Sequence, residues 1–125
     1  MTEREIDAEV AKKVMGWTDF TESRFNGELL GLPEGVSRPK SGDTSSHEII
    51  PRYCAKIEAA WQVGEKVGGA WGVSYYPGHA KFIAYLHPPS IENLTARGSA
   101  ATASMAICLA ALAVRWSPKQ SGVAR

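Results

Sequence analysis

The chain has 125 residues, a length typical of one domain that buries about two-thirds of the surface its unfolded form exposes. Hydrophobic residues make up 44% of the sequence and charged residues 22%, which excludes a disordered or fibrous protein. The net charge of +1 gives no overall preference for long nucleic acid or for an acidic membrane surface, so neither partner is expected.

The first predicted element is a helix over residues 2–16. Thr2 and Glu5 have the spacing of a capping box, and Gly16 stands where a helix commonly ends. Three aliphatic residues between them recur every four positions and form one stripe: Ile6, Val10 and Val14. The acidic, polar start of the chain does not resemble a signal peptide, so we expect a cytoplasmic protein.

The segment that follows the first helix has no clear period. Residues 17–35 mix aromatic residues with turn formers, which predicts irregular chain with at most a short strand. Residues 37–48 are almost wholly polar and predict a loop or insertion.

A second helix and a hairpin are predicted next. Helical spacing runs over residues 51–67 and stops at Gly68 and Gly69. Two alternating segments, residues 71–76 and 81–87, flank a Pro-Gly turn and predict an antiparallel hairpin.

The last predicted element is a helix over residues 101–116 that is apolar on almost every side. We expect it to be the central buried element. Its uninterrupted apolar run, Met105–Val114, is too short to span a bilayer. The order of elements predicts an α+β fold in which helices pack on a small antiparallel sheet, in a single α-β-α sandwich-like domain over residues 1–125.

The histidines and cysteines show no spacing typical of a metal site. They are His47, His79, His87, Cys54 and Cys108. Nucleophile-elbow, P-loop and dinucleotide-binding motifs are also absent from the sequence. We therefore expect no metal, no cofactor and no catalytic residue, and hence a protein that is not an enzyme.

Arg97 is the most suggestive charged residue. It lies in the stretch TARGSA, which predicts a Gly-rich turn just before the last predicted helix, and no acidic residue follows Glu92. A helix N-terminus and an arginine favour an oxyanion together, so this stretch is a candidate anion site. The alternative is an ordinary exposed loop charge.

Three segments resemble the phage ABA-sandwich domain, in which helices flank a β-sheet. They are EVAKKVMGW (residues 9–17), IEAAWQVGEKV (57–67) and SMAICLAAL (104–112). They occur in the expected order and frame most of the chain. The sequence departs from the family at the polar residues 37–48, and it has SM where PL is expected ahead of AIC.

In size and layout the chain also resembles the Thoeris anti-defence sponges, phage proteins that trap cyclic ADP-ribose signals and, in some members, cyclic oligonucleotides. The resemblance implies an adenine held between an aromatic ring and an arginine, with polar helpers for ribose and phosphate. By layout these are Phe82 and Arg97, with Arg24 and Asn93 as helpers. Each also has an ordinary explanation: Phe82 as a core residue, Arg24 as the partner of a nearby glutamate, and Asn93 as a turn residue.

The resemblance implies a homo-oligomer, a dimer or larger, that sequesters cyclic nucleotide immune signals in the cytoplasm of an infected bacterium without cleaving them. The alternative is a non-enzymatic phage structural or regulatory protein that acts through protein–protein contacts.

Overall fold

The structure of the chain is a computed structural model that describes residues 2–37, 46–89 and 95–116. Its helices are α1 (Glu3–Lys13), α2 (Ile57–Val67) and α3 (Ala103–Trp116). Its strands are β1 (Thr18–Glu22), β2 (Leu29–Leu32), β3 (Glu48–Ile49), β4 (Ala70–Tyr76), β5 (Lys81–His87) and β6 (Ala96–Ala100).

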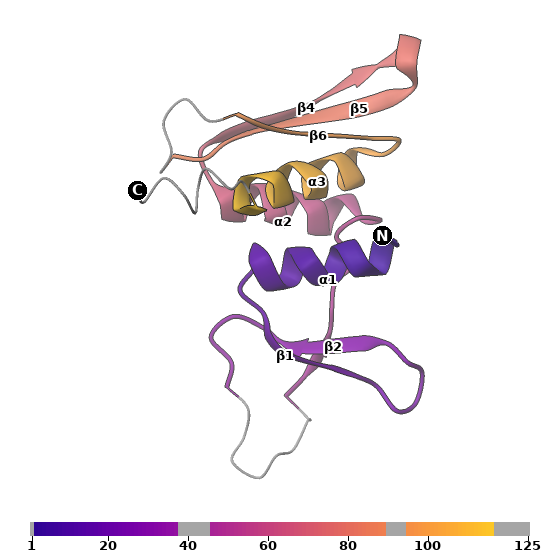
Figure 1. The fold of residues 1–125 in the computed structure, drawn as a ribbon, viewed down its shortest axis with the longest axis vertical. Helices are drawn as coiled ribbons and strands as arrows, with labels where there is room; N and C mark the ends of the chain where they lie inside the picture. The colour runs from indigo at the N-terminus through magenta and orange to yellow at the C-terminus, as the bar shows by residue number, and fades with distance from the viewer. Residues whose placement is uncertain (1, 38–45, 90–94, 117–125) are drawn as a thin grey trace.

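The elements form a layered α+β fold, which confirms the predicted class. Strands β1-β2-β3 make one antiparallel sheet and β4-β5-β6 a second. Figure 1 shows the second sheet at one end of the molecule, α3 and α2 beneath it, then α1, with β1 and β2 at the far end. The described residues therefore form two small sheets where the sequence predicted one.

Helix α1 forms as its sequence predicts. The Thr2 hydroxyl accepts a hydrogen bond from the Glu5 amide at 3.2 Å, and the Glu5 carboxylate accepts one from the Thr2 amide at 2.9 Å. The predicted aliphatic stripe is buried, and Gly16 adopts φ +80° just beyond the helix. A complete capping box thus starts α1, and its apolar face enters the core.

The sheet β1-β2-β3 corrects the prediction of irregular chain over residues 17–35. The register of β1 on β2 shifts between Thr18 and Thr21, where Asp19 has φ 54°. Because this bulge breaks the alternation of side chains, no period of two is visible in the sequence.

His47 and Glu48 correct the far boundary of the predicted polar loop, whose residues 38–45 lie outside the described chain. Glu48 begins β3, and the imidazole of His47 is fully buried. Its Nε2 donates to the Asp19 carbonyl oxygen at 3.1 Å and lies 3.4 Å from the Asp19 carboxylate. The histidine therefore supports the bulge in β1.

Helix α2 begins later than predicted. Residues 53–55 form a turn, across which the Lys56 amide donates to the Arg52 carbonyl at 2.9 Å, and the helix proper starts at Ile57. Its end is as predicted, since Gly68 and Gly69 take φ +79° and +72°.

The hairpin β4-β5 is confirmed, with a continuous register from Ala70↔His87 to Tyr76↔Lys81. The stretch before α3 is a correction. Residues 96–100 are strand β6, paired along β5, and not a turn.

Gly98 explains how β6 fits against α3. A Cβ at this position would collide with the carbonyl oxygen of Ala106 and the backbone nitrogen of Ala110. Strand and helix therefore approach backbone to backbone, and only glycine allows this.

Helix α3 is the central buried element, as predicted. It contacts β5 and β6 on one side and α1 and α2 on the other. Its buried residues are Ser104, Ala106, Ile107, Cys108, Ala110, Ala111, Leu112 and Val114. Contact on several sides accounts for a helix without a polar face.

Candidate functional site

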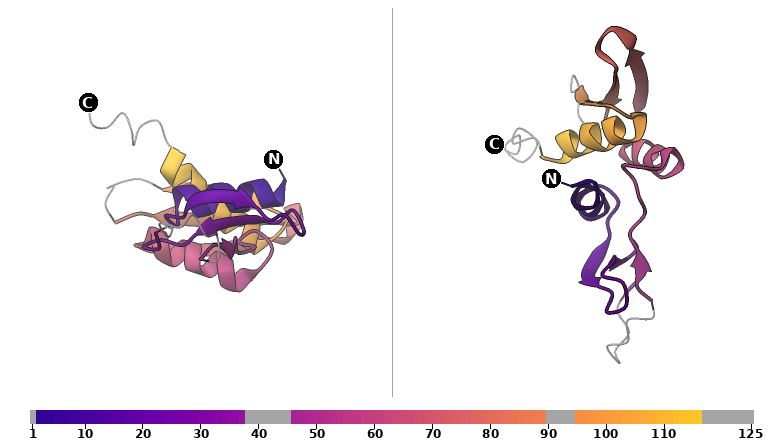
Figure 2. Two further views of the ribbon diagram at one scale, coloured as in Figure 1. Left: turned by 90° about the horizontal axis from the view of Figure 1, so that it is seen from below. Right: turned by 90° about the vertical axis from the view of Figure 1, so that its right-hand side faces the viewer.

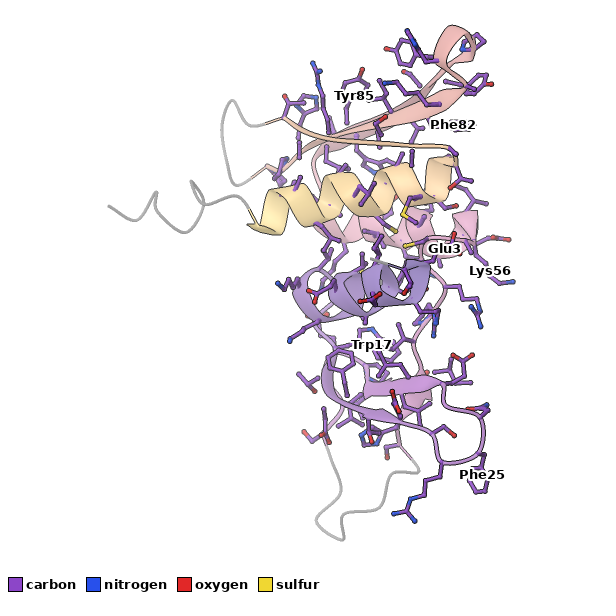
Figure 3. All side chains as sticks on the ribbon, turned by 45° about the vertical axis from the view of Figure 1, so that its right-hand side comes forward. Glu3, Trp17, Phe25, Lys56, Phe82 and Tyr85 are labelled. Carbon is purple, nitrogen blue, oxygen red and sulfur yellow. The ribbon has the colours of Figure 1, made fainter. Side chains whose placement is uncertain are left out.

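The outer face of the β4-β5-β6 sheet gathers tyrosine and arginine side chains. Arg97 on β6 pairs with Tyr85 on β5, and its guanidinium carbon lies 5.5 Å from the centre of the Tyr85 ring. Tyr76 on β4 lies on the same face, with its hydroxyl 3.3 Å from the hydroxyl of Tyr85. We call these three residues the tyrosine–arginine platform; Figure 3 marks Tyr85 on the sheet.

The surroundings of the platform favour anions. Among the described residues from Ala70 to Val114 none is acidic, while Lys81 lies on the same outer face. The hydrogen bond with Tyr85 raises the pKa of the Tyr76 hydroxyl, and the nearby Arg97 acts in the opposite direction. The raised pKa keeps the Tyr76 hydroxyl neutral at physiological pH, and the cations Arg97 and Lys81 determine the local charge.

The platform has the chemistry to hold an aromatic anion. A guanidinium stacked on a ring keeps its N–H groups available at its edge, where they can donate two hydrogen bonds to an oxyanion. An exposed aromatic face can stack on a base, which contributes ~1–3 kcal/mol. Arg97 is exposed, and no carboxylate of the described residues pairs with it.

The predicted partnership of Phe82 and Arg97 is wrong within one chain. Phe82 pairs with Tyr75 and Ala100 and points to the inner face, where it packs on the core. Successive residues of a strand point to opposite faces, so Phe82 and Tyr85 lie on opposite sides of the sheet (Figure 3). The aromatic neighbour of Arg97 is Tyr85.

The setting predicted for Arg97 also needs correction. The residue lies within β6, six positions before α3 begins, and not on a bare turn. Backbone groups of Gly98 to Ala100 belong to a strand paired with β5, so they do not form an open anion cradle.

Arg24, another predicted ligand residue, does not join Arg97. Arg24 lies in the turn between β1 and β2, beside Phe25 at the far end of the molecule (Figure 3). Of the two nearby glutamates expected as partners, Glu22 and Glu28, the second pairs with Arg52 at 3.0 Å and Arg4 at 3.4 Å. Asn93 lies outside the described residues.

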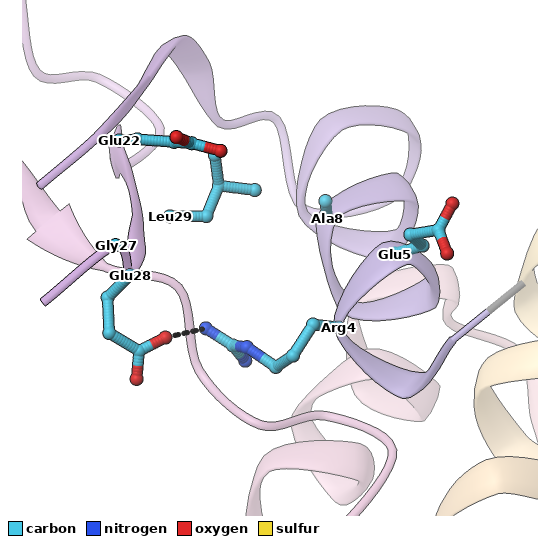
Figure 4. A pocket seen from close by; sticks show the side chains of 7 residues that line it. All are labelled: Arg4, Glu5, Ala8, Glu22, Gly27, Glu28 and Leu29. Atoms are coloured by element: carbon cyan, nitrogen blue, oxygen red, sulfur yellow. Dashed lines mark hydrogen bonds and ion pairs between the residues drawn. The ribbon is translucent and has the colours of Figure 1, made fainter.

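A hollow of about 260 Å³ lies between α1 and the β1-β2 hairpin, away from the platform (Figure 4). Its lining includes Glu5, Glu22 and Glu28 and a single arginine, Arg4. Arg4 is already bound, because it donates to Asp7 at 2.8 Å, to Glu28 and to the Ile50 carbonyl at 3.0 Å. This acidic hollow is therefore unsuited to an anion.

The buried contacts of Asp7 and of the two cysteines were not predicted from the sequence. Asp7 accepts hydrogen bonds from Arg4 and from the Cys54 amide, both at 2.8 Å. The side chains of Cys54 and Cys108 meet in the core, and their hydrogen bond together with burial raises the pKa of the Cys54 thiol. A single acidic residue on an amphipathic helix carries no signal of burial, and cysteines 54 positions apart carry none of contact.

Two classes of site were also sought in the described part of the chain. It places no three residues among histidine, cysteine, aspartate and glutamate where they could hold a metal ion. None of its helices combines the length and apolar character needed to cross a membrane.

Comparison with known proteins identifies the fold. None of the curated proteins compared with the chain matches it. A solved phage protein from Bacillus cereus ATCC 14579 is similar, with 26% sequence identity and a TM-score of 0.68 over 90% of this chain and 86% of that one. The model of the phage ABA sandwich domain matches residues 8–112, most of the length, including all the helical segments that suggested the resemblance. The chain therefore belongs to the phage ABA sandwich domain family.

Proposed function

We propose that this chain is a phage anti-defence protein that binds cyclic nucleotide immune signals, cyclic ADP-ribose isomers or cyclic oligonucleotides, and sequesters them without cleavage. It acts as a homo-oligomer in the cytoplasm of the infected bacterium. The observation that carries the proposal is the contact between Arg97 and Tyr85 on a sheet face without described acids.

The contact supports a cyclic nucleotide as the ligand. A cyclic nucleotide combines a base, which stacks on an aromatic ring or a guanidinium, with phosphate oxygens that accept from arginine. Tyr85 and Tyr76 supply rings and hydroxyl groups, and Arg97 supplies the charge-assisted donors. The resemblance in layout to the Thoeris anti-defence sponges supports the same ligand class, with Tyr85 in the role first expected of Phe82.

The test is titration calorimetry with a panel of cyclic ADP-ribose isomers and cyclic di- and trinucleotides. We expect one compound to bind, and Arg97→Ala to weaken its binding about 10- to 100-fold, because a charge-assisted hydrogen bond contributes ~1.5–3 kcal/mol. Tyr85→Ala is expected to weaken it similarly, while Arg24→Ala serves as the matched control from the other sheet. Unchanged affinity in Arg97→Ala would contradict the site.

Sequestration and hydrolysis are separated by recovering the ligand. A complex with the bound compound is denatured by heat, and the released material is analysed by mass spectrometry. An intact compound supports sequestration, whereas a degraded one contradicts it.

The second candidate, a regulatory or structural protein acting through protein contacts, is favoured by the exposed Ile57 and Trp61 on α2. If no compound of the panel raises the melting temperature, this candidate replaces the first. Saturation at 100 times the dissociation constant adds ~2.7 kcal/mol of stability, so a bound ligand is easily detected.

A further inference from the structure

Gly72 on strand β4 is a glycine that packing does not explain. Of the strand glycines in the described chain, Gly31 and Gly98 lie where a Cβ would press on other atoms, whereas a Cβ at Gly72 would meet nothing within 4 Å. Gly72 has no positive φ, and the register of β4 with β5 does not shift there. Glycine weakens the interior of a strand and otherwise marks a bulge or a place where a ligand or another backbone comes close. Since no described backbone approaches Gly72, the approach of a ligand remains.

The space above Gly72 is open on the outer face of the sheet. Gly72 pairs with Tyr85, and two positions away Ala70 pairs with His87, so these four residues share that face. Over this stretch β4 therefore presents nothing larger than a methyl group. Helices α2 and α3 lie beneath the sheet, and no described element covers its outer face (Figure 2). A ligand can lie above Gly72 without displacing a described side chain.

The ring of Tyr85 borders this space. Arg97 pairs with Tyr85 from the β6 side, and its guanidinium lies over one face of the ring, 5.5 Å from its centre. Because β5 lies between β6 and β4, the opposite face of the ring is turned toward β4, where Gly72 has no side chain. Tyr85 is half-buried, and Tyr76 reaches it through the two hydroxyl groups, 3.3 Å apart. The second face of the Tyr85 ring is thus available for stacking.

A polar pair lies next to the Tyr85 ring. Thr95 continues the register of β6 opposite His87, and its hydroxyl lies 3.1 Å from Nδ1 of the imidazole. The hydroxyl can donate to Nδ1, which leaves the ring proton on Nε2, the nitrogen away from Thr95. His87 is exposed, and its Nε2 has no hydrogen-bond partner among the described residues. Thr95 therefore holds the imidazole in place and leaves it a donor for a ligand.

We propose that the outer face above Gly72 binds a nucleotide, with its base stacked on Tyr85 and its phosphate held by His87. This inference rests on the proposed function and names the residues that hold each part of the ligand. Neighbouring residues on one face of a strand lie about 7 Å apart, so one ribose can join a base on Tyr85 to a phosphate at Nε2 of His87. Arg97 then remains for a second phosphate of the cyclic ligand. We call Gly72, Tyr85 and His87 the nucleotide slot.

Two small probes, AMP and adenosine, test the phosphate site by NMR titration of the amide signals. We expect AMP to bind more tightly than adenosine, because only AMP has a phosphate for His87. His87→Ala should weaken the binding of AMP about 10-fold, the loss of one charge-assisted hydrogen bond, and leave that of adenosine unchanged. His79→Ala, an exposed histidine in the turn of the same hairpin, is the matched control. Equal affinity of the wild type for the two probes, or no binding of either, would overturn the phosphate site, as would an equal effect of the two histidine variants.

A larger side chain at Gly72 tests the base site. Gly72→Leu fills the space beside the Tyr85 ring and should abolish the binding of both probes, while the melting temperature does not fall because the new side chain begins in open space. Gly78→Leu is the matched control, since a Cβ in that turn also meets nothing within 4 Å. Tyr85→Leu keeps an apolar side chain without a ring and should weaken adenosine as well. Binding of adenosine to Gly72→Leu at wild-type affinity would overturn the base site.

The failure of the nucleotide slot and the failure of the proposed function give different results. A cyclic nucleotide of the panel whose binding depends on Arg97 but not on His87 or Gly72 would overturn the slot alone. Binding of AMP that depends on His87, in a protein that binds no compound of the panel, would overturn the proposed function alone.

Discussion

The two sheets flank the same helices but differ in regularity and in charge. The sheet β4-β5-β6 has a seven-residue hairpin in continuous register and an outer face on which no described residue is acidic. The sheet β1-β2-β3 is shorter, contains a bulge at Asp19, and borders a hollow lined by Glu22 and Glu28.

Because of this difference, the place of an arginine in the fold decides whether its guanidinium is available to bind an anion. Arg4 near the first sheet is bound to Asp7, Glu28 and backbone carbonyls, so it is part of the structure. Arg97 on the second sheet rests on Tyr85 and keeps its polar edge available. The following predictions test this division, beginning with the largest change in stability.

The largest expected loss of stability comes from disturbing the packing of strand β6 on helix α3. Gly98→Ala introduces a Cβ that collides with the backbone at Ala106 and Ala110, where no rotamer change can relieve it. We expect a loss of about 3 kcal/mol, at the upper end of the cost of overpacking, measured by urea unfolding. Gly78→Ala in the hairpin turn, where a Cβ meets nothing within 4 Å, is the control and should change stability by less than ~0.5 kcal/mol. Equal stability of the two variants would contradict the close approach.

The second test removes the buried carboxylate that links α1 to the segment before α2. Asp7→Ala leaves the Cys54 amide without its acceptor and Arg4 without its nearest partner, so we expect a loss of ~1.5–3 kcal/mol in thermal unfolding. Asp7→Asn keeps an acceptor oxygen for the amide and should lose less. If both variants melted like the wild type, the link would not contribute to stability.

The third test uses pH. Burial raises the pKa of Tyr53 from 10.0 to about 12, while a hydrogen bond with Trp17 acts in the opposite direction. Between these values the unfolded chain has lost the phenol proton and the folded chain retains it, so stability falls as pH rises through this range. The slope should reach at most ~1.4 kcal/mol per pH unit for this one group. Unfolding by urea between pH 9 and 12 is expected to show a shallower decline in Tyr53→Phe, and an unchanged slope would contradict the shift.

The smallest change in stability distinguishes the two arginines. Arg97→Ala should alter the unfolding free energy by less than ~0.5 kcal/mol, because an exposed side chain supports little structure. Arg4→Ala removes partly buried hydrogen bonds and should cost ~1–2 kcal/mol. Calorimetry with a bound cyclic nucleotide should give the reverse order for affinity. A larger loss of affinity in Arg4→Ala would move the site to the acidic hollow.

Most of the helical layer was predictable because its signals are local. The capping box of Thr2 and Glu5, the glycines that end α2, and the Pro-Gly turn of the hairpin each depend on residues close in sequence. The first sheet was not predictable, since the bulge at Asp19 removes the period of two and the buried His47 comes from a polar stretch.

The candidate site was only partly predictable. Arg97 could be chosen from its acid-poor, glycine-rich surroundings, but the glycine beside it serves helix packing and not anion binding. Phe82 was chosen from the resemblance in layout, but one position in a strand decides which face a side chain joins.

By itself the sequence determined the α+β class, helices α1, α2 and α3 and the hairpin, because capping, periodicity and turn chemistry act over a few residues. The family came from the resemblance of three sequence segments, which the match over residues 8–112 confirms. Only the tertiary structure decided that residues 96–100 form strand β6 and that the ring beside Arg97 is Tyr85 and not Phe82. It also decided that the Arg4 guanidinium is hydrogen-bonded to Asp7 while that of Arg97 is exposed. These outcomes depend on which strand lies beside which and in what register, and register is set by contacts between residues far apart in the chain.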